Sequence, residues 1–425
     1  MTRNLLPLAA LFVGSAFLLF AGGMNGMILP IRGQIEGFSA SSLGLLGTGW
    51  AIGYILGCLR TPALVAKVGH IRAFGVMCAL ASITVLLSLI FLTPTVWIPL
   101  RAISGFCFAG GAMIVESWLN DRADKTSRGR VFGIYTMVNL TASTAGQMSL
   151  TMGDPSGYMF FVLAAVVYCL ALLPTALSAT QTPTALVSLS LNLPSLWRNS
   201  PIAVFAVLMV GISNSAFGTL AAVYAARVGL TEAMVPLFAS VPILAGAVAQ
   251  IPVGYMSDRY DRRKVLIVAA AIGLCADAVF IFLGLHSGWA LLLAGAVFGA
   301  AVYSMYPIII AHANDHAAPG TSIQVSGGLL LVYGVGGIIG PTIAGFAMSA
   351  YGNASLFWTS AVAHILLISF AIVRLRARSS VAAGSKGHFR AAPLPRAATP
   401  ETAVFADEEQ QSLNGSEPGV KATLE

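Results

Sequence analysis

Three ionisable side chains stand inside long apolar segments of the sequence, where a charge is costly unless it has a function. They are Arg101, Glu116 and Asp277. A charge at the centre of a membrane helix costs about 2.5–3.5 kcal/mol on insertion scales, so such residues commonly contact substrates or carry protons. Two alternatives stay open. Arg101 lies near a predicted helix end and could extend to the membrane surface, and Asp277 could be a protonated acid bonded to a neighbouring helix.

The separation of Arg101 and Glu116 rules out a direct ion pair between them. Fifteen residues separate them, which is about 22 Å along a helix axis. We expect Glu116 instead to meet Arg122, Arg128 or Arg130 near one membrane face, and a proton or gating site is the alternative.

A polar stripe is predicted within one apolar segment, because Tyr135, Asn139, Ser143 and Gln147 recur every four residues. In a helix this spacing drifts by only about 40° a step, so the four side chains share one face. Lipid exposure of this face would be costly. We expect the stripe to face a central cavity or, alternatively, to bond to another helix.

Other chemistries lack their sequence patterns. We find no zinc-ligand spacing, no Ser-His-Asp set and no Walker or other phosphate-binding loop. We therefore predict that the chain is not an enzyme and has no cofactor and no metal site. The net charge of +7 is not accompanied by a basic helix interleaved with aromatics, so no nucleic-acid partner is predicted.

Composition indicates a membrane protein, because 57% of the 425 residues are hydrophobic and only 9% are charged. Soluble domains carry about 25% charged residues. A membrane-spanning helix needs about 20 apolar residues, and twelve stretches meet this: 5–30, 41–60, 71–92, 96–117, 131–152, 158–178, 201–225, 233–256, 265–285, 288–311, 324–349 and 354–374.

Basic residues set the predicted orientation. If both termini are cytoplasmic, all of the 23 Lys and Arg residues except Arg32, Arg101 and Arg227 fall in cytoplasmic segments. Cytoplasmic loops of membrane proteins carry this excess of positive charge. The charge of +7 thus has an ordinary explanation.

Two related halves are predicted: a six-helix bundle over 1–178, a cytoplasmic linker over 179–200, a second bundle over 201–376 and a disordered cytoplasmic tail over 377–425. A shift of 192 residues places Gly37 on Gly229 and Lys67 on Arg259. Repeats of this length, one bundle each, are the building units of many transporters.

The loop after the eighth predicted helix carries the clearest motif. It resembles motif A of the major facilitator superfamily, G-x-x-x-D-R-x-G-R-R, at Gly254, Asp258, Arg259, Arg262 and Arg263. The glycine is expected to let two helices approach closely. The resemblance implies a latch between conformations, not a substrate site. Asp261 replaces the usual second glycine, which suggests a variant turn, and Ala66 replaces the aspartate in the first-half copy.

A second motif lies on the fourth predicted helix. Arg101, Gly105 and Ala109 resemble the family's motif B, R-x-x-x-G-x-x-x-A, and the two small residues predict a close-packing face. Glu116-Ser-Trp-Leu-Asn, followed by Arg128-Gly-Arg-Val-Phe, is similar to the poorly characterised bacterial YcaD-type branch. The family resemblance implies that Arg101 handles substrate or protons.

The resemblance also implies that the first, fourth, seventh and tenth helices line a pore, with the second, fifth, eighth and eleventh beside them. The candidate substrate-binding residues are then Asn25, Arg101, Tyr135, Asn139, Gln147, Asn214, Gln250, Tyr303, Tyr306 and Tyr333. For each of them a helix–helix hydrogen bond is the alternative.

The resulting prediction is an all-α membrane protein with the major facilitator fold, in which twelve transmembrane helices form two pseudo-symmetric six-helix bundles. We expect a monomer in a bacterial inner membrane that moves a small organic solute by alternating access, as a secondary active transporter. Protons are the candidate coupling ion, with Glu116 and Asp277 as candidate proton sites. The alternatives are a facilitator without ion coupling, a drug or metabolite exporter, and a non-transporting sensor. Exporters of the family often carry G-P-x-x-G-G in the fifth helix. Here Gly146 is followed by Gln147 where that pattern has proline, which disfavours the exporter alternative.

Overall fold

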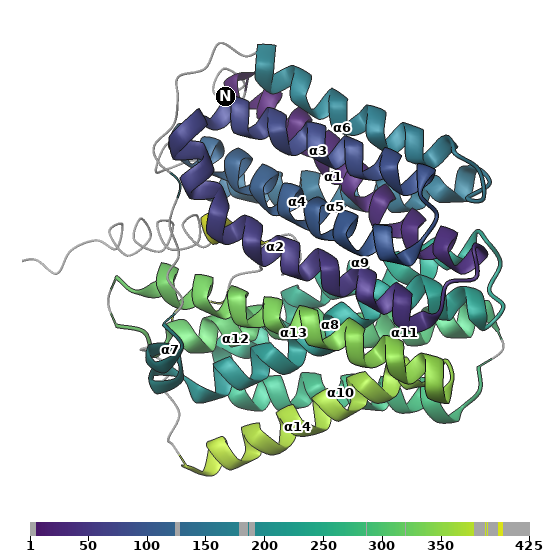
Figure 1. The fold of residues 1–425 in the computed structure, drawn as a ribbon. Helices are drawn as coiled ribbons and strands as arrows, with labels where there is room; N and C mark the ends of the chain where they lie inside the picture. Colours follow the sequence, from purple (N-terminus) through teal and green to yellow (C-terminus); the bar gives the residue numbers. More distant parts are fainter. Residues whose placement is uncertain are drawn as a thin grey trace, which may run out of the picture.

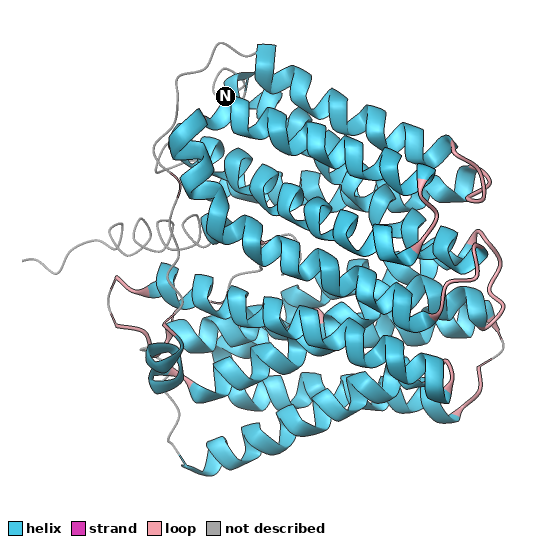
Figure 2. Cartoon of the chain, viewed as in Figure 1, coloured by secondary structure: helices cyan, strands magenta, loops and turns pink. Residues whose placement is uncertain are grey.

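A computed structural model of the chain describes residues 6–123, 128–177, 186, 192–285, 287–318, 320–377, 387, 389 and 398–402. Within these residues the secondary structure is helical and contains no strand (Figure 2). Helices are the expected form of apolar segments, because lipid offers no partner for free backbone groups. Helices of the first half lie in the upper part of Figure 1 and those of the second half in the lower part.

The helices of the first half are α1 (Leu6–Ile35), α2 (Ala40–Val68), α3 (His70–Ile90), α4 (Pro94–Arg122), α5 (Arg128–Met148) and α6 (Met159–Leu177). The short helix α7 (Leu193–Asn199) precedes the second half. The second half contains α8 (Pro201–Arg227), α9 (Met234–Arg259), α10 (Arg262–Phe282), α11 (Gly288–Val302), α12 (Met305–Asn314), α13 (Ser322–Tyr351) and α14 (Ser355–Ala377).

The predicted spans match these helices, with two departures. Eleven segments of the described chain are long and apolar enough to cross a membrane. The remaining predicted span, 131–152, corresponds to α5 and falls short of that hydropathy because of its polar stripe. The tenth predicted span is interrupted between α11 and α12, where Pro307 in the first turn of α12 has no N–H to continue the helical bonding.

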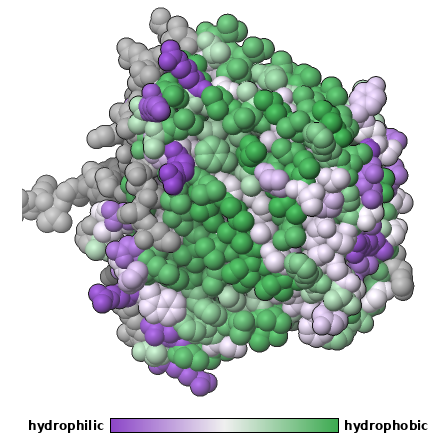
Figure 3. Space-filling model, in the orientation of Figure 1, coloured by the Kyte–Doolittle hydropathy of each residue, from purple (hydrophilic) through white to green (hydrophobic). Residues whose placement is uncertain are grey.

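Apolar side chains also cover much of the outer surface. Figure 3 shows a broad hydrophobic face over the middle of the bundle, with hydrophilic residues toward its two ends. Large residues such as Ile83, Leu86, Val248 and Ile251 are exposed on the outside of the bundle. In water such a surface would be a liability, but it fits the hydrocarbon region of a bilayer.

The predicted internal repeat is visible in the backbone. Gly37 follows α1 with φ of 78°, and Gly229 follows α8 with φ of 85°. Glycine adopts this left-handed region without steric cost. The same turn therefore ends the first helix of each half.

The halves meet directly at one end of the bundle. We call the end that carries α7 and the loop between α9 and α10 the linker end, and the other the far end; the linker end is on the left of Figure 1. At the far end the Ser41 N–H donates to Ser349 Oγ at 2.9 Å, and the Thr48 and Thr342 hydroxyls lie 2.6 Å apart. The Arg227 guanidinium donates to Gln34 at 2.9 Å. The two halves are thus closed against each other at the far end.

The predicted linker and tail fall largely outside the described residues. In the linker, α7 is described, and Asn192 caps it by accepting from the Ser195 N–H. In the tail, residues 387, 389 and 398–402 are described and lie against the bundle. These residues are bound by polar groups of both halves, and most of the tail that is predicted to be disordered lies outside the described residues.

Candidate transport path

A small cavity lies between the two halves. It is lined by Gly47, Trp50, Ala51 and Tyr54 of α2, Ser215 and Thr219 of α8, and Tyr333, Gly334 and Gly337 of α13. Aromatic rings supply apolar walls, and hydroxyls of serine, threonine and tyrosine supply hydrogen bonds. Binding sites for small molecules commonly have this mixed character.

Glu116 is fully buried on α4, with a side chain bound by hydroxyl groups. Its Oε1 accepts a hydrogen bond from the Tyr135 hydroxyl at 3.0 Å. Its Oε2 accepts from the Thr399 hydroxyl at 2.5 Å and from the Thr402 hydroxyl at 2.8 Å. The carboxylate thus faces donors that come from α5 and from the tail.

The expectation that Glu116 pairs with Arg122 or Arg130 is wrong within the described contacts, and the side chain of Arg128 lies outside the described part of the chain. Arg122 ends α4, and no ion pair between it and Glu116 is found among the described residues. The physical reason is burial. Glu116 points into the bundle toward Tyr135, whereas the end of α4 leads outward to the loop.

Arg101 and Asn25 lie together inside the first half. Asn25 Nδ2 donates to Ser104 Oγ at 3.3 Å, which joins α1 to α4. Tyr168 of α6 lies within electrostatic reach of Arg101. Only 7% of Arg101 is exposed, so the side chain is turned into the bundle and does not extend to the surface.

The small residues of motif B pack as predicted. A side chain at Gly105 would collide with the Trp50 carbonyl of α2, and one at Gly53 would collide with the Ala102 carbonyl of α4. Helices α2 and α4 are therefore in close backbone contact, and this contact fixes where Arg101 and Glu116 stand.

The α5 stripe is divided between three neighbours. Tyr135 reaches Glu116, Asn139 Oδ1 accepts from Ser15 of α1 at 2.7 Å, and Ser143 packs against Gly23 of α1. Gln147 Oε1 accepts from Ser240 of α9 at 2.9 Å and so joins the two halves. The described contacts of Tyr135, Asn139 and Gln147 are hydrogen bonds to other helices, and the cavity-facing alternative stays a prediction.

The second-half candidates are all buried. Neither polar atom of the Asn214 amide has a hydrogen-bond partner among the described residues. The rings of Tyr306 and Tyr333 contact each other with centroids 5.6 Å apart. Gln250 and Tyr303 are buried on α9 and directly after α11. Of these candidates, Tyr333 lines the cavity.

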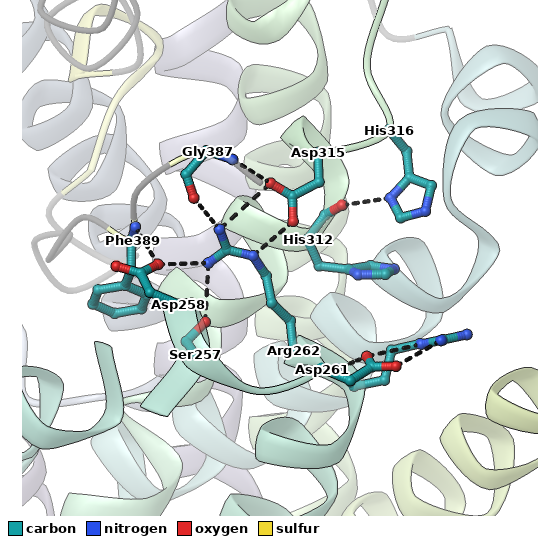
Figure 4. Close-up of polar contacts among 10 residues, drawn as sticks. Ser257, Asp258, Asp261, Arg262, His312, Asp315, His316, Gly387 and Phe389 are labelled. Atoms are coloured by element: carbon teal, nitrogen blue, oxygen red, sulfur yellow. Dashed lines mark hydrogen bonds and ion pairs between the residues drawn. The ribbon is translucent and has the colours of Figure 1, made fainter. Parts of the chain in front are cut away.

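The motif A loop forms a buried ionic cluster at the linker end (Figure 4). Arg262 Nε lies 2.7 Å from Asp315 Oδ2, and its Nη1 donates to Ser257 Oγ at 3.0 Å. Asp258 lies 3.6 Å from the same guanidinium. The Arg262 and Asp315 side chains are 1% and 4% exposed. This cluster ties the α9–α10 loop to the end of α12.

Two motif positions have roles that the sequence did not fully predict. Gly254 faces the Phe389 ring of the tail, not a second helix as expected. Asp261 accepts from the Arg263 N–H at 3.0 Å and begins α10 as its N-cap, which explains an aspartate where the family has glycine. Arg259 lies over the Tyr255 ring, 3.9 Å from its centroid.

Asp277 is paired within the second half. Its Oδ2 lies 2.8 Å from His364 Nδ1, and both side chains are fully buried. His364 Nε2 lies 3.4 Å from Ser213 Oγ, which is 2.6 Å from Ser360 Oγ. This network joins α8, α10 and α14.

Sequence reasoning missed Thr399, Thr402, Tyr54 and Asp315 as members of the path. The threonines stand in a tail whose composition is typical of linkers. Asp315 lies in a loop without Lys or Arg, so charge patterning did not single it out. The signal that was present is the pair of hydroxyls at 399 and 402, spaced for one helical face.

The helical bundle, its apolar surface and its buried polar path define a polytopic membrane transporter. The sequence profile described as Major Facilitator Superfamily matches residues 11–239 and 203–408. The chain therefore belongs to the major facilitator superfamily.

Its relatives place it in the YcaD-type branch. An uncharacterized MFS-type transporter YcaD of Salmonella arizonae is 26% identical over 360 residues, covering 83% of this chain and 91% of the relative. An uncharacterized MFS-type transporter of Enterobacter sp. is 25% identical over 380 residues, covering 85% and 94%.

Solved structures share the fold. A mutant of the nucleoside transporter NupG superimposes with a TM-score of 0.74 at 14% identity and covers 87% of this chain and 100% of its own. A bacterial homolog of the human lysosomal transporter Spinster, in an inward-facing and occupied conformation, gives 0.65 at 15% identity and covers 98% of each chain.

Proposed function

We propose that the protein is a secondary active transporter that moves a small organic solute by alternating access. The solute would bind in the cavity between the halves and near Glu116. The halves of residues 1–178 and 201–376 would rock around this site. With the linker end cytoplasmic, as the basic residues predict, the described conformation is the one closed to the outside.

The observation that carries this proposal is an asymmetry between the two ends. At the far end, α2 and α13 contact each other directly through Ser41, Thr48, Thr342 and Ser349. At the linker end, the buried carboxylate of Glu116 binds hydroxyl groups of the tail instead of the other half. A path closed at one end by helix–helix contacts is one of the two states that alternating access needs.

Protons are the proposed coupling ion, and two acids could carry them. Glu116 lies beside the path, whereas Asp277 is bonded to His364 inside the second half. Glu116 is therefore the favoured site. A proton-coupled carrier in proteoliposomes should change the lumenal pH when solute is added, and a facilitator should not.

The first experiment identifies the solute. Purified wild-type protein and the Arg101→Ala variant are screened by thermal shift against metabolites and drugs, because a ligand at 100 times its Kd adds about 2.7 kcal/mol. A ligand that stabilises the wild type gives the substrate class. A ligand that stabilises both proteins equally would show that Arg101 is not part of the binding site.

The second experiment tests alternating access with a disulfide across the far end. The double variant Ser41→Cys, Ser349→Cys should lose transport of the identified solute on oxidation and regain it on reduction. Each single variant is the control. Undiminished transport by the oxidised double variant would contradict the proposal.

A further inference from the structure

Tail residues occupy the interior of the linker end, although α14 has already ended at Ala377. Ala398 is 5% exposed, Thr399 1% and Thr402 8%. Polar tail residues this buried must be bound specifically, because a buried hydroxyl without a partner is costly. Their partners come from both halves of the protein.

The first contact is made with the first half. The Thr399 and Thr402 hydroxyls both donate to Glu116 Oε2, and the Thr399 N–H donates to Thr402 Oγ1 at 2.8 Å. The Tyr54 hydroxyl donates to the Ala398 carbonyl. Tyr54 also lines the central cavity. The segment 398–402 therefore lies between that cavity and the linker end.

The second contact is made with the second half, at the motif A cluster (Figure 4). The Gly387 N–H donates to Asp315 Oδ1 at 3.0 Å, and the Gly387 carbonyl accepts from Arg262. The Phe389 N–H donates to Asp258 Oδ1 at 2.7 Å, and its ring lies against Gly254. Gly254 thus provides the space that the Phe389 ring fills.

These two contacts join the halves at the end that has to close when the far end opens. We propose that the tail is a built-in inhibitor of transport, in which Gly387 and Phe389 bind the second half and residues 398–402 bind the carboxylate of Glu116. This inference rests on the proposed transport function. The docked segment blocks exit toward the linker end and holds the halves apart there, so each transport cycle requires its release.

The chemistry of this contact also indicates what competes with the tail. Glu116 receives hydroxyl donors from Tyr135, Thr399 and Thr402. A solute with hydroxyl or ammonium donors can replace the two threonines, because a carboxylate binds such donors strongly. Binding of such a solute and docking of the tail are therefore mutually exclusive.

Docking is tested without any transport assay. Ala398→Cys is introduced in a protein that carries Cys169→Ser and Cys275→Ser, because these two native cysteines are exposed. The thiol introduced by Ala398→Cys should react slowly with a maleimide in the folded protein. Adding Thr399→Val and Thr402→Val should speed the reaction about tenfold or more, because hydrogen bonds to a charged group are among the stronger ones.

The matched control is Thr151→Val, at an exposed residue whose hydroxyl donates to Met148 in its own turn. It should leave the labelling rate unchanged. Equal, fast labelling with and without the two valine substitutions would show that the segment does not dock, and would overturn the inference.

Inhibition is then tested by comparing transport by the full chain, the Thr399→Val, Thr402→Val variant and a chain ending at residue 386. The Thr399→Val, Thr402→Val variant should transport faster than the full chain, and so should the truncated chain. For the valine variant the increase should match the factor by which the same two substitutions speed labelling, because only the undocked fraction is competent. Unchanged transport in a protein whose tail is shown to dock would overturn the inhibitory role and leave the proposed function intact. Absence of transport by all three proteins would overturn both, while the labelling result still decides whether the tail docks.

Discussion

Removing one partner of the Arg262–Asp315 ion pair should strongly destabilise the folded protein. Asp315→Asn leaves a guanidinium that is 1% exposed, with Asp258 3.6 Å away as its remaining anion. Breaking a buried ion pair by removing one partner costs about 3–5 kcal/mol. No discount for solvent screening applies, because both side chains are almost fully covered. We expect Asp315→Asn to lower stability within this range.

The measurement is thermal or denaturant unfolding of the purified protein in detergent, with Arg259→Ala as the control. Arg259 is an exposed member of the same motif that contacts the Tyr255 ring, and such exposed contacts contribute about 0.5–1 kcal/mol. A double variant, Arg262→Gln with Asp315→Asn, should recover part of the loss because no buried charge is left alone. A loss for Asp315→Asn no larger than that of Arg259→Ala would refute the reasoning.

Three other predictions concern helix packing, a helix cap and the buried acid of the second half. Gly105→Val should destabilise by about 1–3 kcal/mol or more by forcing α2 from α4, whereas Gly133→Ala, with open space around it, should stabilise by up to about 1 kcal/mol; unfolding measurements that rank them equally would contradict the packing. Burial acts to raise the pKa of Asp261, but the hydrogen bonds and charge of Arg263 outweigh it and hold this pKa below its ordinary value. Its contribution is therefore present above the unfolded pKa of about 3.9 and lost as pH falls through the folded value. Asp261→Ala should cost about 1 kcal/mol at pH 7, less below about pH 4, and Asp261→Ser should restore the cap; a pH-independent deficit argues against this assignment. If Asp277 only bonds His364, Asp277→Asn should reduce stability and leave the proposed coupling of transport to protons intact. Loss of coupling at normal stability would make Asp277 the proton site instead.

The membrane helices could be predicted from the sequence because their cause is local. About 20 consecutive apolar residues are sufficient for a span. Helix α5 does not reach the hydropathy of the other spans, but the spacing of Tyr135 and Asn139 still indicated a helix with one polar face. A close-packing face on α4 was also predictable, since Gly105 and Ala109 lie one turn apart, whereas its partner α2 is known from the structure.

The partners of the buried charges could not be predicted, because they are far away in sequence. Glu116 is bonded to Thr399 and Thr402, which lie 283 and 286 residues further along the chain. Arginines nearby in sequence were the expected partners. The partners are instead determined by the direction in which α4 points the Glu116 side chain, which is toward Tyr135 and the tail. Asp277 and His364 are likewise 87 residues apart, and the sequence around either residue does not indicate that the other is its partner.

In the proposed alternating-access cycle, the far-end contact between α2 and α13 has to open. It includes close backbone approach at Gly44 and Gly345 and hydrogen bonds of small hydroxyl side chains. Each such hydrogen bond contributes only about 0.5–1.5 kcal/mol net. These hydrogen bonds together should therefore contribute a few kcal/mol to the closed far end, which is close to the roughly 2.7 kcal/mol that a bound ligand at 100 times its Kd supplies. A bound solute can thus offset the cost of breaking them.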